Sequence, residues 1–157
     1  MKCLIILLLT TLLSACANRM YINYQGNDSV HIEFVSKTSS YVTYTLFSDD
    51  YDCYGVKFIN YMKPINTTSI QAKPKSAFTI EYMYNTTSSR SVSYCGGIYS
   101  ILNSARYVKF VTKHSSSTCS IIAYSKNAPS GEWIINNSLV KRNKTKPFVN
   151  NEGPWCE

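Results

Sequence analysis

Histidine is scarce in this chain, and no two cysteines stand close enough to suggest a metal site. Only His31 and His114 occur among the 157 residues, and neither lies near a cysteine in sequence. Zinc sites are usually built from ligand pairs about two to four residues apart, such as CxxC, which the chain lacks. No GxSxG turn is present to expose a nucleophilic serine. We therefore expect a non-catalytic protein that binds no metal and no cofactor.

The residues that remain as candidates for chemistry have simpler structural explanations. His31 lies between two apolar residues of an alternating segment, so we expect its side chain to face solvent. His114 opens a polar, serine-rich turn. Three acids, Asp49, Asp50 and Asp52, offer the oxygen ligands that calcium prefers, but their spacing lacks the glycine and glutamate of an EF-hand loop. We interpret them as a polar turn.

A single long apolar run, Cys3–Leu13, occupies the N-terminus after Met1 and Lys2. It is too short to cross a bilayer, which takes ~20 apolar residues. A positive start, a short apolar core and small residues at its end are typical of a secretory signal. Residues 1–15 are therefore predicted to be a signal peptide.

The end of this run, Leu13-Ser14-Ala15-Cys16, resembles the lipobox of bacterial lipoproteins. The resemblance implies a lipid on the Cys16 thiol and cleavage that makes Cys16 the new N-terminus. By the same resemblance, alanine at position 17 implies sorting to the outer membrane, and we expect the anchored domain to face the periplasm. The alternative is an ordinary signal peptide cut after Ala15 or Ala17, because the surrounding small residues also suit that cleavage.

Removal of residues 1–15 leaves 142 residues, enough for one domain with a sizeable core. Four cysteines then remain besides the lipidated one: Cys53, Cys95, Cys119 and Cys156. An even number in an exported protein predicts two disulfides. Three pairings are possible. We favour Cys53–Cys95 and Cys119–Cys156, because the C-terminal cysteine needs a partner to hold the end of the chain.

Alternating apolar and polar residues, rich in β-branched and aromatic types, predict strands along the whole mature chain. The predicted strands are Val30–Phe34, Tyr41–Phe47, Val56–Tyr61, Phe78–Tyr84, Tyr107–Thr112 and Ser120–Tyr124. Polar turn-forming runs separate them. Short strands at this spacing predict an all-β protein with a single β-sandwich, immunoglobulin- or transthyretin-like.

Helix is expected for at most one turn, around Ile98–Ser104, and Met20–Tyr24 is a further candidate strand. No linker or shift in composition divides the chain after its signal. We expect residues 16–29 to form the lipidated N-terminus and a short tether, and residues 30–157 to form the sandwich.

The order "IQAKPKSAFTIEYMY", then Cys95, then "ARYVKFVTKHSSSTCSIIAYS" resembles a loose class of small disulfide-bonded bacterial lipoproteins. The likeness covers about half of the chain. Most members of that class have no assigned activity, so the resemblance implies a compartment and a fold more than a function.

The formal net charge is +7, and the charges are spread along the chain except for one dense basic run near the C-terminus. That run contains Lys141, Arg142, Lys144 and Lys146. It is a candidate contact for anionic lipid headgroups, lipopolysaccharide or glycan. The alternative is a solvated loop. No nucleic-acid-binding motif is present, and an exported protein would rarely meet nucleic acid.

Thirteen tyrosines suit both half-buried strands and binding surfaces. We therefore expect a membrane-anchored envelope accessory or binding module with a protein or glycan partner. One alternative is an inhibitor or immunity-type protein against a toxin or cell-wall hydrolase, since "YDCYG" is similar to the opening of periplasmic lysozyme inhibitors. Another is a secreted eukaryotic or viral glycoprotein. Five Asn-x-Ser/Thr triplets favour it, at Asn27, Asn66, Asn85, Asn136 and Asn143.

Overall fold

The computed structural model describes residues 20–38, 40–63, 65–87, 92–115, 118–145 and 154–157. Within these ranges the chain forms strands and connecting loops, with no helix. No helix among them is long and apolar enough to cross a membrane. The strands are β1 (Val30–Ser36), β2 (Tyr41–Phe47), β3 (Val56–Met62), β4 (Asn66–Ala72), β5 (Ala77–Thr87), β6 (Val92–Leu102), β7 (Tyr107–Ser115), β8 (Thr118–Lys126), β9 (Ile134–Ile135) and β10 (Val140–Arg142).

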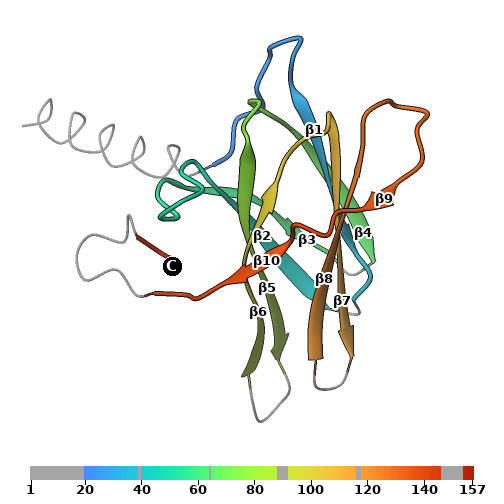
Figure 1. The fold of residues 1–157 in the computed structure, drawn as a ribbon. Helices are drawn as coiled ribbons and strands as arrows, with labels where there is room; N and C mark the ends of the chain where they lie inside the picture. The colour runs from blue at the N-terminus through green and yellow to red at the C-terminus, as the bar shows by residue number, and fades with distance from the viewer. Residues whose placement is uncertain (1–19, 39, 64, 88–91, 116–117, 146–153) are drawn as a thin grey trace, which may run out of the picture.

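Two five-stranded sheets pack face to face (Figure 1). One has the order β4-β1-β7-β8-β9 and the other the order β10-β6-β5-β2-β3. All neighbouring strands are antiparallel except β1 and β7, which are parallel. The prediction of an all-β sandwich with two disulfides is confirmed.

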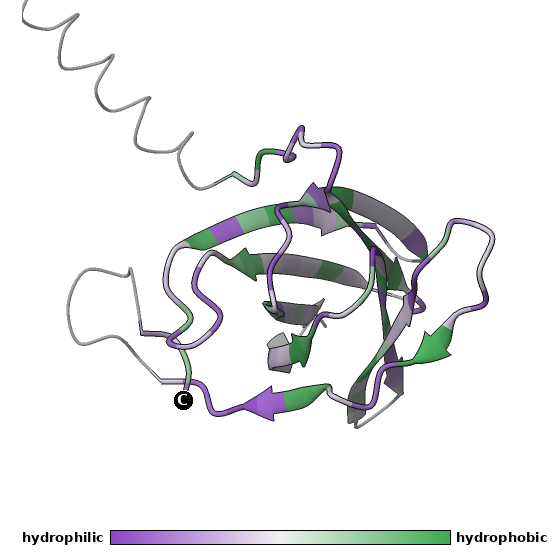
Figure 2. Cartoon of the chain, turned by 45° about the horizontal axis from the view of Figure 1, so that its top comes forward, coloured by the Kyte–Doolittle hydropathy of each residue, from purple (hydrophilic) through white to green (hydrophobic). Residues whose placement is uncertain are grey.

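The core forms because alternate residues of each strand point between the sheets. In β1 burial alternates at every position, and Ile32 and Phe34 are completely buried. The Phe34 ring lies 4.8 Å from the Tyr44 ring and 5.6 Å from the Phe110 ring, so aromatic side chains from both sheets meet at the centre. Figure 2 shows hydrophobic and hydrophilic residues mixed along the same strands, as expected when each sheet buries one face.

All six predicted strands are present, but the predicted helical turn at Ile98–Ser104 is wrong. Strand β6 continues to Leu102 because it pairs with β5, where Ile101 lies opposite Phe78. The segment Met20–Tyr24 forms only an isolated bridge, between Met20 and Phe58, rather than a strand.

A second, smaller apolar cluster lies on the outer face of the β10-β6-β5-β2-β3 sheet. It contains Phe47, Cys53, Ile98 and Cys156, with Trp155 packed against them. Ile98 lies on the outer face together with Glu81, its partner on β5, whereas Tyr99 and Ile101 on β6 pack in the main core. The C-terminal residues therefore cover part of the outer surface of this sheet.

The strand register defines two ends of the sandwich. At the first, the start of β1 lies opposite the end of β4, with Val30 paired to Ala72, and we call it the N-terminal end. At the second, Ser36 lies between Asn66 and Thr112, and the strands of the β5–β6 and β7–β8 hairpins end there. We call this the hairpin end; it is the lower end in Figure 1.

Candidate functional site

The four predicted cysteines do form two disulfides, but the favoured pairing is wrong. The bonds are Cys53–Cys156 and Cys95–Cys119. Cys95 in β6 and Cys119 in β8 both pack against the main core, so their bond joins the two sheets, with 5.9 Å between the Cα atoms. Cys53 lies in the β2–β3 loop on the outer face, where the C-terminus arrives. The packing of the folded chain, between the sheets for Cys95–Cys119 and on the outer face of one sheet for Cys53–Cys156, decides the pairing rather than distance along the sequence.

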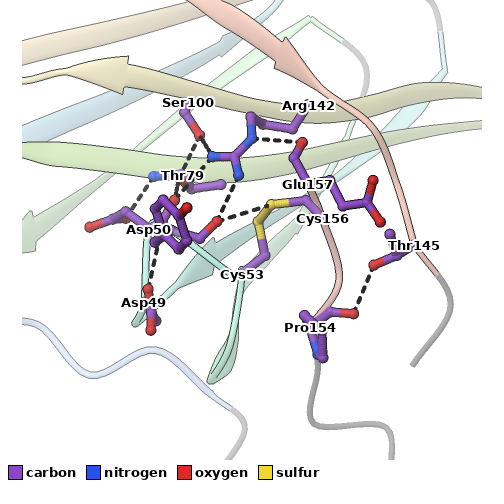
Figure 3. The surroundings of a disulfide bond; sticks show 11 residues. Asp49, Asp50, Cys53, Thr79, Ser100, Arg142, Thr145, Pro154, Cys156 and Glu157 are labelled. Atoms are coloured by element: carbon purple, nitrogen blue, oxygen red, sulfur yellow. Dashed lines mark hydrogen bonds between the residues drawn. A yellow bond between two sulfur atoms is a disulfide. The ribbon is translucent and has the colours of Figure 1, made fainter. Parts of the chain in front are cut away.

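Arg142 of the predicted basic run is bound within the protein (Figure 3). Its guanidinium donates to the backbone oxygens of Glu157 at 2.9 Å, Asp50 at 3.3 Å and Tyr51 at 2.7 Å. It also donates to the Ser100 hydroxyl at 3.2 Å. One side chain thus joins β10, β6, the β2–β3 loop and the C-terminus next to the Cys53–Cys156 bond.

The rest of the basic run is divided between different surroundings. Lys144 pairs with Glu81 of β5 at 2.5 Å, and its ammonium lies 6.0 Å from the centre of the Trp155 ring. Lys141 is exposed. Lys146 lies outside the described residues. A continuous cationic surface over the whole run stays a prediction, while two of its members have partners inside the fold.

The acidic loop has a structural role centred on Asp50. Its carboxylate accepts the Thr79 amide at 2.9 Å and the Lys75 ammonium at 3.1 Å, and its backbone oxygen accepts the Thr79 hydroxyl. Burial raises the pKa of the Asp50 carboxyl, against the opposing effects of Lys75 and Thr79. The loop is thereby fastened to β5. In the described part of the chain, no three histidines, cysteines or acids gather where they could hold a metal ion.

Both histidines take part in contacts within the sheets. His31 is half-buried on the outer face, where its Nδ1 lies 3.1 Å from the Gln71 side-chain nitrogen and its ring 6.0 Å from the Tyr107 ring. His114 is opposite Cys119 in the hairpin, and its ring stacks on the buried Tyr84 ring at 4.1 Å. Each position is explained by packing.

Cys16 and the predicted signal peptide lie outside the described residues. The described chain begins at Met20 and joins the sandwich at once: Met20 bridges Phe58, and the Tyr21 amide donates to the Phe58 oxygen at 2.8 Å. The Tyr21 hydroxyl donates to the Gln71 oxygen at 2.8 Å. These bonds fasten Met20 and Tyr21 to strands of both sheets.

A groove opens beside Tyr21 at the N-terminal end of the sandwich. Its volume is about 380 Å³, and its lining includes Phe47 and Phe78. Three lysines line it: Lys57, Lys73 and Lys75. They come from β3 and from the β4–β5 connection, so they are far apart in sequence. Sequence inspection missed this group because none of the three stands in a dense basic run.

Two further surface features emerge from strand pairing. On the outer face of β7 and β8, Lys109 and Lys126 place their ammonium groups 4.0 Å and 4.7 Å from the centre of the Trp133 ring. At the hairpin end, the exposed rings of Tyr41 and Tyr61 stack at 4.9 Å. The Tyr-x-Lys pattern repeated in β7 and β8 could have signalled the first; the second depends on the β2–β3 register.

Comparison with protein-family models, with curated proteins and with solved structures finds no match to this chain. Its function therefore has to be argued from its own residues.

Proposed function

We propose that this protein is a lipoprotein of a bacterial outer membrane, anchored through Cys16, whose periplasm-facing sandwich is a non-catalytic binding module for a protein or glycan of the cell envelope. The lipobox-like Leu13-Ser14-Ala15-Cys16, placed directly after a short apolar run, supports the anchor. Two disulfides suit a fold that matures in an oxidising compartment.

The observation that carries this proposal is the short distance along the chain between the anchor and the fold. Only Ala17, Asn18 and Arg19 separate Cys16 from Met20, which already bridges Phe58. A cysteine in this position suits attachment of the domain directly at a membrane surface. The same proximity supports an accessory role close to the membrane.

The hairpin end supports a binding role. Tyr41 and Tyr61 are 42% and 50% exposed although their rings stack at 4.9 Å with an interplanar angle of 8°. Large, rigid rings with few rotatable bonds and a polar tip are favoured at binding surfaces. Because this end lies opposite the N-terminal end, the tyrosine pair would point away from the membrane that holds Cys16.

The anchor is tested by replacing Cys16 with serine and feeding cells a fatty acid that carries an alkyne tag. We expect the wild-type protein to take up the tag and to fractionate with outer membranes, and Cys16→Ser to do neither. Incorporation of the tag into both proteins, or into neither, would contradict the proposal.

The binding surface is tested by crosslinking in intact cells. The variant Tyr41→Ser/Tyr61→Ser is expected to lower the yield of a discrete crosslinked complex by about tenfold, because interface tyrosines are frequent hot spots. Tyr51→Ser is the matched control, since Tyr51 is 80% exposed and lies outside this pair. Equal yields from all three proteins would refute a role for the tyrosine pair.

A further inference from the structure

A small pocket opens on the outer face of the β10-β6-β5-β2-β3 sheet, where β6 carries two adjacent glycines. Its volume is about 200 Å³, and its lining includes Glu81, Met83, Gly96, Gly97 and Lys144. Sites for drug-sized ligands usually measure ~300–1,000 Å³. The pocket therefore suits a single ring or group of a longer ligand rather than a whole cofactor.

Gly96 leaves the floor of this pocket without a side chain. A Cβ atom at this position would lie 2.1 Å from the backbone oxygen of Tyr82, and the φ of Gly96 is 156°. The close approach of β6 to β5 therefore requires glycine here. Tyr82 also lines the pocket although its side chain is buried in the main core, so its backbone forms part of the floor. A ligand can thus approach the backbone of two strands closely.

The two charged residues of the pocket neutralise each other. The Glu81 carboxylate and the Lys144 ammonium lie 2.5 Å apart, and the other lining residues are uncharged. A carboxylate has about four lone-pair sites and an ammonium has three protons, so the pair keeps hydrogen-bonding capacity for a ligand. The pocket therefore suits a neutral ligand with hydroxyl groups better than an anion or a cation.

The strand register joins this pocket to the tyrosine pair at the hairpin end. Met83 lies between Gly96 on β6 and Thr43 on β2, and Thr43 lies opposite Tyr61 on β3. Residues directly opposite each other share one face of a sheet, and neighbouring strands are ~4.8 Å apart. Gly96, Met83, Thr43 and Tyr61 thus form one row, ~14 Å long, on the outer face. We call it the outer row.

The tyrosine end of the outer row offers flat aromatic faces. The Tyr41 and Tyr61 rings cover one face of each other, yet they are 42% and 50% exposed, so their other faces are open to solvent. The face of an aromatic ring carries partial negative charge, which attracts the polarised C–H groups on the face of a sugar ring. Hydroxyl groups at the edge of a sugar suit the acid–base pair at the other end. Both ends of the outer row therefore match groups of one kind of ligand.

We propose that the outer row binds a neutral oligosaccharide of the cell envelope, with one sugar ring against Tyr41 and Tyr61 and another at the Glu81–Lys144 pocket. The inference rests on the proposed binding role of the tyrosine pair and names the ligand class: a glycan rather than a protein. It also extends the binding surface from the tyrosines across β2 and β5 to the glycine floor on β6.

The test applies the full-length mature protein to an array of immobilised oligosaccharides. The neutral probes are oligomers of glucose, galactose and N-acetylglucosamine, and the anionic probes are oligomers of galacturonic acid. We expect retention on at least one neutral series. The signal should stay the same between ~0.05 and ~0.5 M salt, because salt screens charge interactions and a neutral ligand makes none over long range.

Two variants test the two ends of the outer row. Tyr41→Ser/Tyr61→Ser should lower retention about tenfold, because exposed aromatic residues are frequent hot spots. Its matched control is Tyr51→Ser, which removes a ring that is 80% exposed and lies outside the row. We expect the control to bind like the wild-type protein.

The pocket end is tested by Glu81→Gln/Lys144→Gln, which keeps the size of both side chains and the net charge. We expect a loss of about tenfold, because hydrogen bonds to charged groups are stronger than those to neutral ones. Glu132→Gln/Lys37→Gln is the matched control, since both residues are exposed and lie in loops outside the row. The control should bind like the wild-type protein.

Three results would overturn the proposed ligand: no retention on any neutral series, stronger retention on galacturonic acid that falls with salt, or equal retention by the pocket variant and its control. The proposed binding role fails separately, if Tyr41→Ser/Tyr61→Ser leaves crosslinking in cells unchanged. If crosslinking falls, the crosslinked partner is a protein and the array stays empty, the binding role stands and the glycan ligand fails. Circular dichroism and intact disulfides confirm that each variant is folded before it is compared.

Discussion

Replacement of Arg142 by alanine would remove the side chain that joins β10, β6, the β2–β3 loop and the C-terminus. Four hydrogen bonds of 2.7 to 3.3 Å would be lost. A hydrogen bond to a charged group contributes ~1.5–3 kcal/mol when buried, and less at a partly exposed site such as this one. Taking ~0.5–1 kcal/mol for each, we expect Arg142→Ala to lower the free energy of unfolding by ~2–4 kcal/mol.

The assay is equilibrium unfolding in denaturant with both disulfides intact. Lys141→Ala is the matched control, because Lys141 is the exposed neighbour on the same strand, and surface substitutions usually change stability by less than ~0.5 kcal/mol. Arg142→Lys should restore little, since one ammonium cannot reproduce the planar fork of a guanidinium. If Arg142→Ala matched Lys141→Ala, the bonds would not stabilise the fold, and Arg142 would again be available for an external partner.

Other consequences of the structure can be measured on the same protein. Burial raises the pKa of Tyr44 from 10.0 to about 12, opposed by its hydrogen bond with Thr112, so the unfolded chain ionises first. The free energy of unfolding therefore includes a contribution of ~2–3 kcal/mol from Tyr44 that is present below about pH 10 and is lost as the pH rises towards 12. In Tyr44→Phe the denaturant midpoint should fall less steeply over this pH range. An unchanged pH profile would count against this explanation. Ile65 is 79% exposed and has a φ of 48°, a left-handed conformation that is costly for a β-branched residue and not for glycine. Ile65→Gly should therefore raise the free energy of unfolding by ~1 kcal/mol. A loss of stability would argue against backbone strain at this position. Replacing Cys95 and Cys119 by alanine opens a loop with a sequence separation of 24 and should cost at most ~3.5 kcal/mol by chain entropy; peptide mapping that instead links either cysteine to Cys53 or Cys156 would contradict the pairing.

The strands could be predicted from the sequence because their signal is local. Each predicted strand alternates apolar and polar side chains, and each is present, for example Val30–Phe34 within β1. Strand β4 was missed because Asn66–Ser69 is polar and only Ile70 and Ala72, at its end, are buried. Its polar half is a strand because it pairs with β1. The end of β6 was mistaken for a helical turn because its character depends on pairing with β5.

The candidate site could not be predicted because its parts are brought together by contacts between distant segments. Lys57 and Lys73 share a groove only because β3 and the end of β4 meet at one end of the sandwich. Cys53 meets Cys156 only because the C-terminus crosses the outer face of a sheet. Density of charge along the sequence instead pointed to Arg142, whose partners are internal.

The central claim, a lipid-anchored and doubly bridged envelope domain, is tested most directly by the intact mass of the mature protein from its own host, with and without reductant. The account predicts a chain that begins at Cys16 and carries the mass of acyl chains. It also predicts a gain of about 4 Da on reduction, two hydrogens for each of the bonds Cys53–Cys156 and Cys95–Cys119. A chain without acyl groups that begins after Ala15 or Ala17, or one made heavier by glycans, would contradict it.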